Sequence, residues 1–451
     1  MLCSKRALTA GAGVVAAALA MAACSSGNVS SGGGGGDGKN VTLNLATVNN
    51  GQMKDMEKLK GEYEKAHPGT KINFQVMEEG DLRAAVTADV ASKAGQYDIV
   101  TIGAYETPQW GANGWLVDLT PKLQSDASYD VDDILPPVRD VNSYNGKLFA
   151  VPFYGESSIL MYNKDVASAA GVKLSDNPTW QEVADAAKKM NSPKMAGICM
   201  RGKPGWGDLF APLTTVVQTF GGNWYDDSWN ATVNTPEWKQ AVTFYKTMLD
   251  TSGEKDPVSY SFNECLTALK EGKAAMWADA SVAASMLEAD DSPVKGKMGY
   301  AHMPVDKTKE SGWLWSWNLA IPSSTKKQDA AVDFVKWATS KEYIKLVGQK
   351  IGWSNVPPGS RTSTYEIPEY KKAAAAYAPL TLDVMSSVNP KQPGVNPQSW
   401  VGIQYVSIPE YQDVGNQCAQ LVADYIANRG TVDDALGKCQ AIAKKAGDAH
   451  K

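Results

Sequence analysis

Hydrophobic and polar positions along residues 41–103 follow the period of a strand and the period of a helix in turn. Residues 41–48 alternate apolar and polar side chains, which predicts a strand, and residues 53–66 have the three-to-four-residue spacing of a helix. The same patterns predict a strand at 71–77, a helix at 81–93 and a buried strand at 97–103. This β-α-β-α-β order predicts a largely parallel sheet with helices on its faces.

A second series of elements follows two further strands that we predict at 146–153 and 157–163. Helix starts are marked by capping boxes at Thr179 and Ser261, each followed by Glu three positions later, and by Pro236 at a first helical position. The remaining patterns predict strands at 273–278 and 313–322, helices at 328–339 and 341–350, and a mainly helical region from 368, interrupted by a proline-rich loop at 389–397.

Two α/β units, with the chain crossing between them more than once, predict a two-lobe α/β fold. Each lobe is expected to be a mostly parallel sheet flanked by helices, with a hinged cleft between the lobes. We assign residues 41–156 and 320–367 to lobe 1, and residues 157–319 and 368–451 to lobe 2. The cleft would lie at the ends of the strands, where open sheets bind their ligands.

The first 40 residues have the order of a lipoprotein export signal. Lys5 and Arg6 precede an apolar run at 7–21, which leads to two alanines, Cys24 and a stretch rich in serine and glycine. We expect residues 1–23 to be removed, Cys24 to carry lipid, and residues 24–40 to form a flexible tether. The alternative is a membrane span, but the apolar run falls short of the roughly 20 residues that a span needs. The protein is therefore expected outside the cytoplasm, attached to the membrane through lipid alone.

Composition and charge narrow the function. The chain has 451 residues, of which 43% are hydrophobic and 21% charged, and its formal net charge is -5. This charge argues against a nucleic-acid binder, which would present a basic stripe. The 14 Trp and 18 Tyr outnumber the 8 Phe. Such residues combine an apolar face with a polar group and suit a ligand that carries both C–H and O–H groups, although core packing explains most of them.

Four cysteines remain outside the signal region, an even number in an oxidising compartment. Pairing of Cys418 with Cys439 would connect two helices of a C-terminal hairpin, and pairing of Cys199 with Cys265 follows by elimination. The rival interpretation is a metal site. Because there is no C-x-x-C and the chain has only three His, we expect neither a metal nor a cofactor.

Familiar catalytic motifs are absent from the sequence. It contains no G-x-S-x-G, no H-E-x-x-H and no G-K-[ST]. Paired carboxylates could support glycoside hydrolysis. With 49 acidic residues, however, such a pair can always be chosen, so the pattern carries little information.

Polar and aromatic residues placed just after the predicted strands are more informative. Each has a structural alternative, since any one of them could serve packing or connect the lobes. A polyhydroxylated ligand needs carboxylates as acceptors, Arg and Asn as donors, and Trp against its C–H surface. The residues at these strand ends are Asn49, Tyr105, Glu106, Tyr154, Glu156, Arg201, Asp279, Trp315 and Trp317.

At these same positions the chain resembles the substrate-binding lipoproteins of ABC importers, in the maltose-binding-like superfamily. General likeness lies in residues 41–66, 97–103, 162–165, 272–276 and 318–322. More specific segments resemble the branch that binds sugar alcohols such as mannitol, sorbitol and arabitol: YETPQWGANGW at 105–115, PFYGES at 152–157 and SWVGIQYVSIPEY at 399–411. The resemblance implies a two-lobe clamp that presents its ligand to a membrane permease, and it adds Trp400 to the candidate binding residues.

We therefore expect a non-enzymatic, monomeric binding protein for a polyol or small sugar. Asp279 and Glu156 would accept hydrogen bonds from vicinal hydroxyls, Arg201 would donate, and Trp315 or Trp317 would form an apolar wall. One alternative is an oligosaccharide or monosaccharide binder of the same class. Alternatives of other classes are an extracellular glycosidase or lyase and a purely structural surface lipoprotein.

Overall fold

A five-stranded sheet forms the first half of the molecule. The computed structural model describes residues 40–451. The strand order is β2-β1-β3-β10-β6, with bounds β1 Val41–Val48, β2 Thr70–Met77, β3 Ile99–Gly103, β6 Ala150–Glu156 and β10 Trp315–Ala320. The first three strands are parallel, as predicted, but β10 is antiparallel to both β3 and β6. The central strands β3 and β10 are buried along their whole length.

A second sheet has three strands in the order β8-β7-β9, with bounds β7 Ser158–Asn163, β8 Met276–Ala280 and β9 Met298–His302. Both of its ladders are antiparallel. The predicted α/β fold is confirmed. The expectation of a mostly parallel sheet in each lobe is wrong for this second sheet, and the first sheet is mixed, with two parallel and two antiparallel pairings.

The chain's crossings between the two sheets explain the antiparallel pairs. β7 begins at Ser158, directly after β6 ends at Glu156 in the first sheet, so β7 runs away from the boundary between the sheets. Its neighbour β8 runs towards that boundary, because Ala280 at its end lies opposite Ser158. In the same way β10 enters the first sheet at Trp315, opposite the end of β6, and runs away from the boundary.

The position of β10 also bears on the expected lobe limits. All of Trp315–Ala320 pairs within the first sheet. A boundary between residues 319 and 320 would therefore cut this strand, and the topology favours a crossing just before Trp315.

Helices cover the sheets and largely match the predicted positions. In the first half they are α1 Gly51–Ala66, α2 Glu79–Ser92, α3 Glu106–Ala112, α4 Thr120–Gln124, α5 Pro136–Val141, α12 Gln328–Ala338 and α13 Lys341–Lys350. Around the second sheet lie α6 Lys164–Ala169, α7 Trp180–Met190, α8 Phe210–Thr219, α9 Pro236–Ser252, α10 Phe262–Lys270 and α11 Ala283–Leu287. Both predicted capping boxes are confirmed, at Thr179 before α7 and at Ser261 before α10, and Pro236 opens α9.

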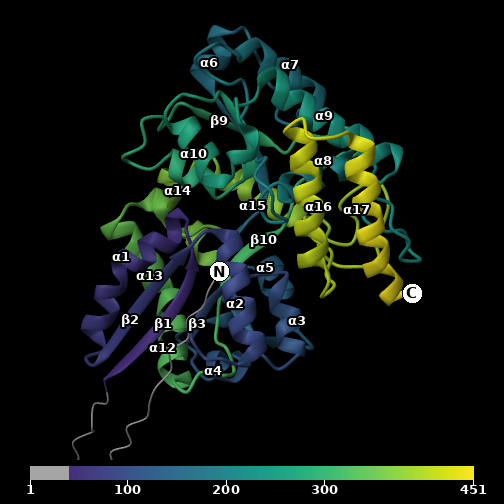
Figure 1. The fold of residues 1–451 in the computed structure, drawn as a ribbon. Helices are drawn as coiled ribbons and strands as arrows, with labels where there is room; N and C mark the ends of the chain where they lie inside the picture. Colours follow the sequence, from purple (N-terminus) through teal and green to yellow (C-terminus); the bar gives the residue numbers. More distant parts are fainter. Residues whose placement is uncertain (1–39) are drawn as a thin grey trace, which may run out of the picture. The chain divides into compact units, whose positions relative to one another are not determined.

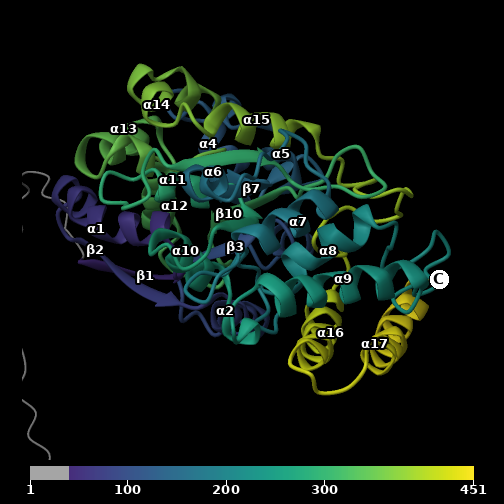
Figure 2. The same ribbon diagram turned by 90° about the horizontal axis from the view of Figure 1, so that it is seen from above.

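The C-terminal region is mainly helical, as predicted, with α14 Pro368–Ala373, α15 Ala378–Ser387, α16 Tyr411–Ile426 and α17 Val432–Gly447. Figures 1 and 2 show α16 and α17 side by side, joined by a short turn. The Cys418–Cys439 disulfide connects them, and Cys199–Cys265 forms the second predicted disulfide.

Within residues 40–451, no helix is long and apolar enough to cross a membrane. The same region holds no cluster of three or more His, Cys, Asp or Glu arranged to bind a metal. The expected signal segment 1–23, the lipid site Cys24 and nearly all of the tether 24–40 lie outside the described residues.

Candidate functional site

A pocket opens where strands of both sheets end. It encloses about 690 Å³ of empty space, including its mouth. Six of the residues proposed from sequence line it: Asn49, Tyr154, Glu156, Arg201, Trp315 and Trp317. Further lining residues that sequence reasoning did not select as site residues include Glu79, Arg83, Trp206, Asp208, Ser261 and Trp313.

The end of β1 supplies two asparagines to the pocket. The Asn49 side chain donates to Glu78 Oε1 at 2.5 Å, and Asn50 Nδ2 donates to the Tyr154 hydroxyl at 2.8 Å. The Asn50 side-chain oxygen also accepts from Met53 N, which caps α1. Because one side chain caps a helix and binds Tyr154, the position of the Tyr154 hydroxyl is coupled to the start of α1.

Arg201 and Asp279 form an ion pair beneath the pocket. Asp279 is fully buried, and its four lone-pair positions are filled by Arg201 Nε and Nη2, Trp277 Nε1 and the backbone N–H of Ala280. Burial alone would lower the pKa of Arg201, but the Asp279 carboxylate raises it. Arg201 lines the pocket, whereas Asp279 does not. The structure therefore places the Asp279 carboxylate against the Arg201 guanidinium and outside the pocket lining.

The reason for this difference is the end of β8. The sequence pattern predicts a strand at 273–278 with Asp279 just beyond it, but β8 continues to Ala280. Asp279 thus lies within the second sheet, paired with Ile159 of β7.

Glu156 is the last residue of β6 and has a buried side chain in the pocket lining. Burial raises the pKa of Glu156 to about 8; Arg201 opposes this shift, while Asp279 and Glu79 add to it. Its Oε2 has no hydrogen-bond partner among residues 40–451. Leaving a buried polar atom unpaired costs about 1–3 kcal/mol, so Oε2 is free to pair with a group that enters the pocket.

A second buried carboxyl, Asp208, lies in the loop that follows Arg201. Burial raises the pKa of Asp208 to about 6, and the nearby Glu79 adds to the shift. The Ser261 hydroxyl donates to Asp208, and Ser261 also caps α10. The pocket therefore combines carboxyls of raised pKa with guanidinium donors, a mixture that can both donate to and accept from hydroxyls.

Arg83 of α2 is the most connected lining residue that the sequence analysis missed. Its Nε and Nη2 donate to Glu79 Oε1 at 3.1 and 2.8 Å, and its Nη1 donates to Glu106. The i,i+4 spacing of Glu79 and Arg83 on a helix was the available signal. Glu106 was proposed as a binding residue, but it does not line the pocket; it accepts from Arg83 and from Gly103 N.

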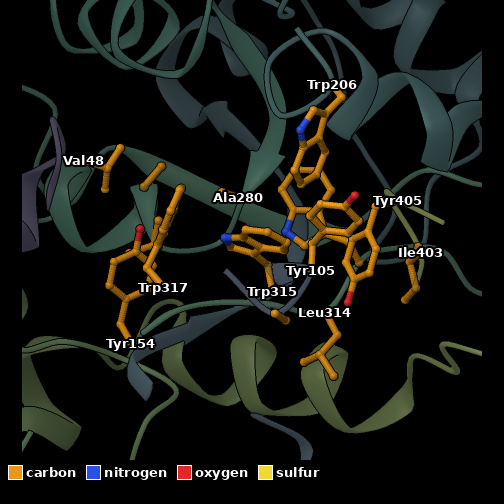
Figure 3. Close-up of a cluster of buried hydrophobic side chains, with 14 of the residues drawn as sticks. Val48, Tyr105, Tyr154, Trp206, Ala280, Leu314, Trp315, Trp317, Ile403 and Tyr405 are labelled. Carbon is orange, nitrogen blue, oxygen red and sulfur yellow. The ribbon is translucent and has the colours of Figure 1, made fainter. Parts of the chain in front are cut away.

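Four indoles line the pocket, those of Trp206, Trp313, Trp315 and Trp317. In Figure 3, Trp315 lies between Trp317 and the pair Tyr105 and Tyr405, with Trp206 above. The ring centroids of Trp315 are 5.6 Å from Trp317 and 5.9 Å from Trp206.

Tyr105 and Trp400 lie outside the pocket lining. The Tyr105 hydroxyl donates to Ile408 O at 3.0 Å, and its ring packs behind Trp206 at 5.2 Å. Trp400 packs against Tyr225 and Trp229, at 5.8 and 5.7 Å between ring centroids. The expectation for Tyr105 came from its position after a strand, and that for Trp400 came from the resemblance. In the structure both rings pack against other aromatic side chains.

Comparison with known proteins gives consistent matches over most of the chain. The family profile described as bacterial extracellular solute-binding protein matches residues 49–345. A mannitol-binding protein of Pseudomonas aeruginosa is 42% identical over 403 residues, which are 88% of this chain and 91% of that protein.

Solved structures agree with this. A solute-binding protein of an ABC transporter from Agrobacterium vitis S4, with bound D-mannitol, superposes with a TM-score of 0.88 at 45% identity, covering 91% of this chain and 99% of that one. A solute-binding protein from Agrobacterium radiobacter K84 in complex with ribitol superposes with a TM-score of 0.80 at 27% identity, covering 90% of this chain and 99% of that one. The protein belongs to the family of bacterial extracellular solute-binding proteins.

Proposed function

We propose that this protein is the extracytoplasmic substrate-binding component of an ABC importer and that its ligand is a linear polyol of the mannitol type. The observation that carries the proposal is the convergence of hydroxyl-binding groups from both sheets on one pocket. Arg201 and Asp208 come from the loop between α7 and α8, beside the second sheet. Glu156 comes from β6 of the first sheet and Arg83 from the neighbouring helix α2. Relatives with bound D-mannitol and ribitol support the ligand class.

Binding would proceed by closure of the two lobes on the ligand. Residues from the two sides already meet at the pocket, since Asn263 Nδ2 donates to Asn49 O at 3.0 Å. A further contact outside the pocket lining joins Gln52 Nε2 to Ser285 Oγ at 2.8 Å. A ligand that contacts both sides stabilises the closed arrangement because the open one cannot make both sets of contacts. We propose lobes as predicted, with the last crossing moved to just before Trp315.

Within the pocket, Glu156 would bind a ligand hydroxyl through its unpaired Oε2, and Arg201 would donate to another. Asn49, Tyr154, Trp315 and Trp317 complete the proposed contacts. A linear polyol has no flat ring face, so polar groups would carry more of its affinity than aromatic stacking.

Attachment to the membrane rests on the proposed lipid at Cys24, and the tether 24–40 would give the binding domain room to reach the permease. The permease subunits of the importer are the proposed protein partners, and the protein would act as a monomer.

Calorimetric titration and thermal unfolding of residues 24–451 against a panel test the function. D-mannitol, D-sorbitol, D-arabitol and ribitol would be compared with D-glucose, D-fructose and maltose. A polyol at 100 times its dissociation constant should add about 2.7 kcal/mol of stability. Binding of maltose alone would favour the oligosaccharide alternative, and release of products from oligosaccharides would favour a glycosidase. No binding by any polyol would reject the proposal.

A further inference from the structure

The space between three indoles of the pocket is occupied by the protein's own guanidinium. The Cζ atom of Arg83 lies 4.1 Å from the ring centroid of Trp206, 5.0 Å from Trp317 and 5.2 Å from Trp315. All three distances are within the range of about 6 Å in which a cation is attracted to an aromatic face. We call the space between Trp206, Trp315 and Trp317 the indole box, and the Arg83 guanidinium occupies it.

Two carboxylates hold Arg83 in this place. Glu79 accepts two of its N–H groups and Glu106 accepts a third. The side chains of Arg83 and Glu106 are only 6% and 3% exposed. A planar group that is bonded at its edge and stacked on its face has little freedom to leave the box.

Faces of Trp residues are what a ring sugar needs, because the C–H surface of a pyranose packs flat against an aromatic ring. Here the guanidinium competes for the faces of Trp206, Trp315 and Trp317. Three of its five N–H groups are used within the described residues, so two remain for ligand oxygens. Arg83 thus blocks the indole faces for stacking and presents N–H donors to ligand oxygens in their place.

We propose that Arg83 is a specificity-determining residue, which makes this pocket select open-chain polyols over ring sugars by occupying the indole box and presenting N–H donors to hydroxyls. The inference rests on the proposed function and deepens it. It assigns the selectivity to one residue of α2, outside the strand ends on which the sequence analysis relied.

The test compares the dissociation constants of D-mannitol and methyl α-D-glucopyranoside, measured by calorimetry, in the wild type and three variants. Arg83→Ala vacates the box, and Arg83→Lys keeps a cation without a planar face. Arg361→Ala is the matched control, because Arg361 is also buried, bonded to Asp133 and stacked 4.6 Å over Tyr129, but does not line the pocket.

For Arg83→Ala we expect mannitol affinity to fall by about tenfold or more, because the variant loses the N–H donors to ligand hydroxyls. Glucoside affinity should rise, because the indole faces become free, so the preference for mannitol falls by at least about tenfold; a glucoside affinity that stays at the wild-type value would mean that the guanidinium does not exclude ring sugars. Arg83→Lys should lower the preference in the same direction. Arg361→Ala should lower the unfolding temperature and leave the preference at the wild-type value.

A wild-type preference in both Arg83 variants would overturn the proposal, and so would an equal loss of preference in Arg361→Ala. If Arg83→Ala does not fold, Arg83→Lys alone decides the question. A wild type that binds no polyol would instead reject the proposed function, which the same titrations reveal separately.

Discussion

Arg201 and Asp279 are joined by two parallel hydrogen bonds, with Nε 2.7 Å from Oδ2 and Nη2 bound to Oδ1, where the carboxylate has no solvent exposure. The pair comes from a loop and a strand that are 78 residues apart in the sequence. Its consequence is that one pocket-lining donor, Arg201, depends on a residue that the ligand would not touch.

Asp279→Asn should weaken both stability and polyol binding. Removing one charge from a buried pair leaves the other uncompensated, which costs about 3–5 kcal/mol. Urea unfolding measures the first effect and calorimetric titration with D-mannitol measures the second. Trp400→Phe serves as the comparison. Because Trp400 packs on Tyr225 and Trp229 away from the pocket, this variant should bind D-mannitol with the affinity of the wild type. Equal losses of affinity in the two variants would contradict the assigned role of Asp279.

Glu156 should make the stability of the ligand-free protein decrease with pH. Its pKa is about 8 in the folded protein and near 4.5 when the chain is unfolded, so the folded state holds a proton that the unfolded state has released. The stabilising contribution is complete below pH 4.5 and is lost as pH rises through 8. The expected slope is about 1.4 kcal/mol per pH unit in this window.

Glu156→Gln removes the titration and should flatten the dependence. Urea unfolding at pH 5, 6.5 and 8 compares the variant with the wild type. Asp208, whose pKa of about 6 is also raised, contributes to both proteins, so their difference isolates Glu156. Parallel curves for the two proteins would mean that Glu156 is ionised in the fold.

How far the sequence predicts this molecule depends on how local the deciding contacts are. The ends of strand β1 and helix α1 are predicted almost correctly, because the alternation of apolar and polar side chains along consecutive residues shows where each element begins and ends. The caps at Thr179 and Ser261 are likewise local, since each joins residues three positions apart. The direction of β7 and β10 is not local: it follows from where the chain crosses between sheets.

The candidate site shows the same division. Residues at the ends of strands β1 and β6, such as Asn49 and Glu156, line the pocket, as the general rule for open sheets predicts. The rule does not select Arg83, because this residue lies on a helix and reaches the pocket only through tertiary packing. Asp279 illustrates a different limit: two residues of error in the end of a strand change a pocket residue into a buried partner of one.

The disulfide Cys199–Cys265 should contribute to binding as well as to stability. Cys199 lies two residues before Arg201, and Cys265 lies in α10, whose cap Ser261 and first-turn Asn263 line the pocket. Replacing both cysteines by serine should cost about 2–5 kcal/mol of stability and also reduce mannitol affinity.

The matched control is the Cys418–Cys439 pair, which connects α16 and α17 and contributes no side chain to the pocket. The double serine variant at this pair should lose stability in the same range and keep its affinity. Unfolding and titration of both variants at equal temperature make the comparison. A loss of affinity in the control alone would be the opposite of what the contacts imply.

Gly207→Ala should weaken binding although alanine fits the backbone there. Gly207 follows Trp206 in the pocket wall, and its φ is not positive. A Cβ at this position would lie 1.9 Å from Glu79 Oε1, the atom to which Arg83 donates twice. Glu79 Oε1 is the end of a flexible side chain and can shift at little cost in stability, but the shift falls on the bonds that hold Arg83.

Gly61→Ala provides the reference for a glycine with free space. A Cβ at Gly61 would meet no atom within 4 Å, and the residue is inside helix α1. Alanine should stabilise this helix by about 1 kcal/mol and leave binding unchanged. Calorimetry with D-mannitol and urea unfolding of both variants separate the effects. Wild-type affinity in Gly207→Ala would show that Glu79 moves aside freely, so that its bonds to Arg83 are not needed for the pocket to bind.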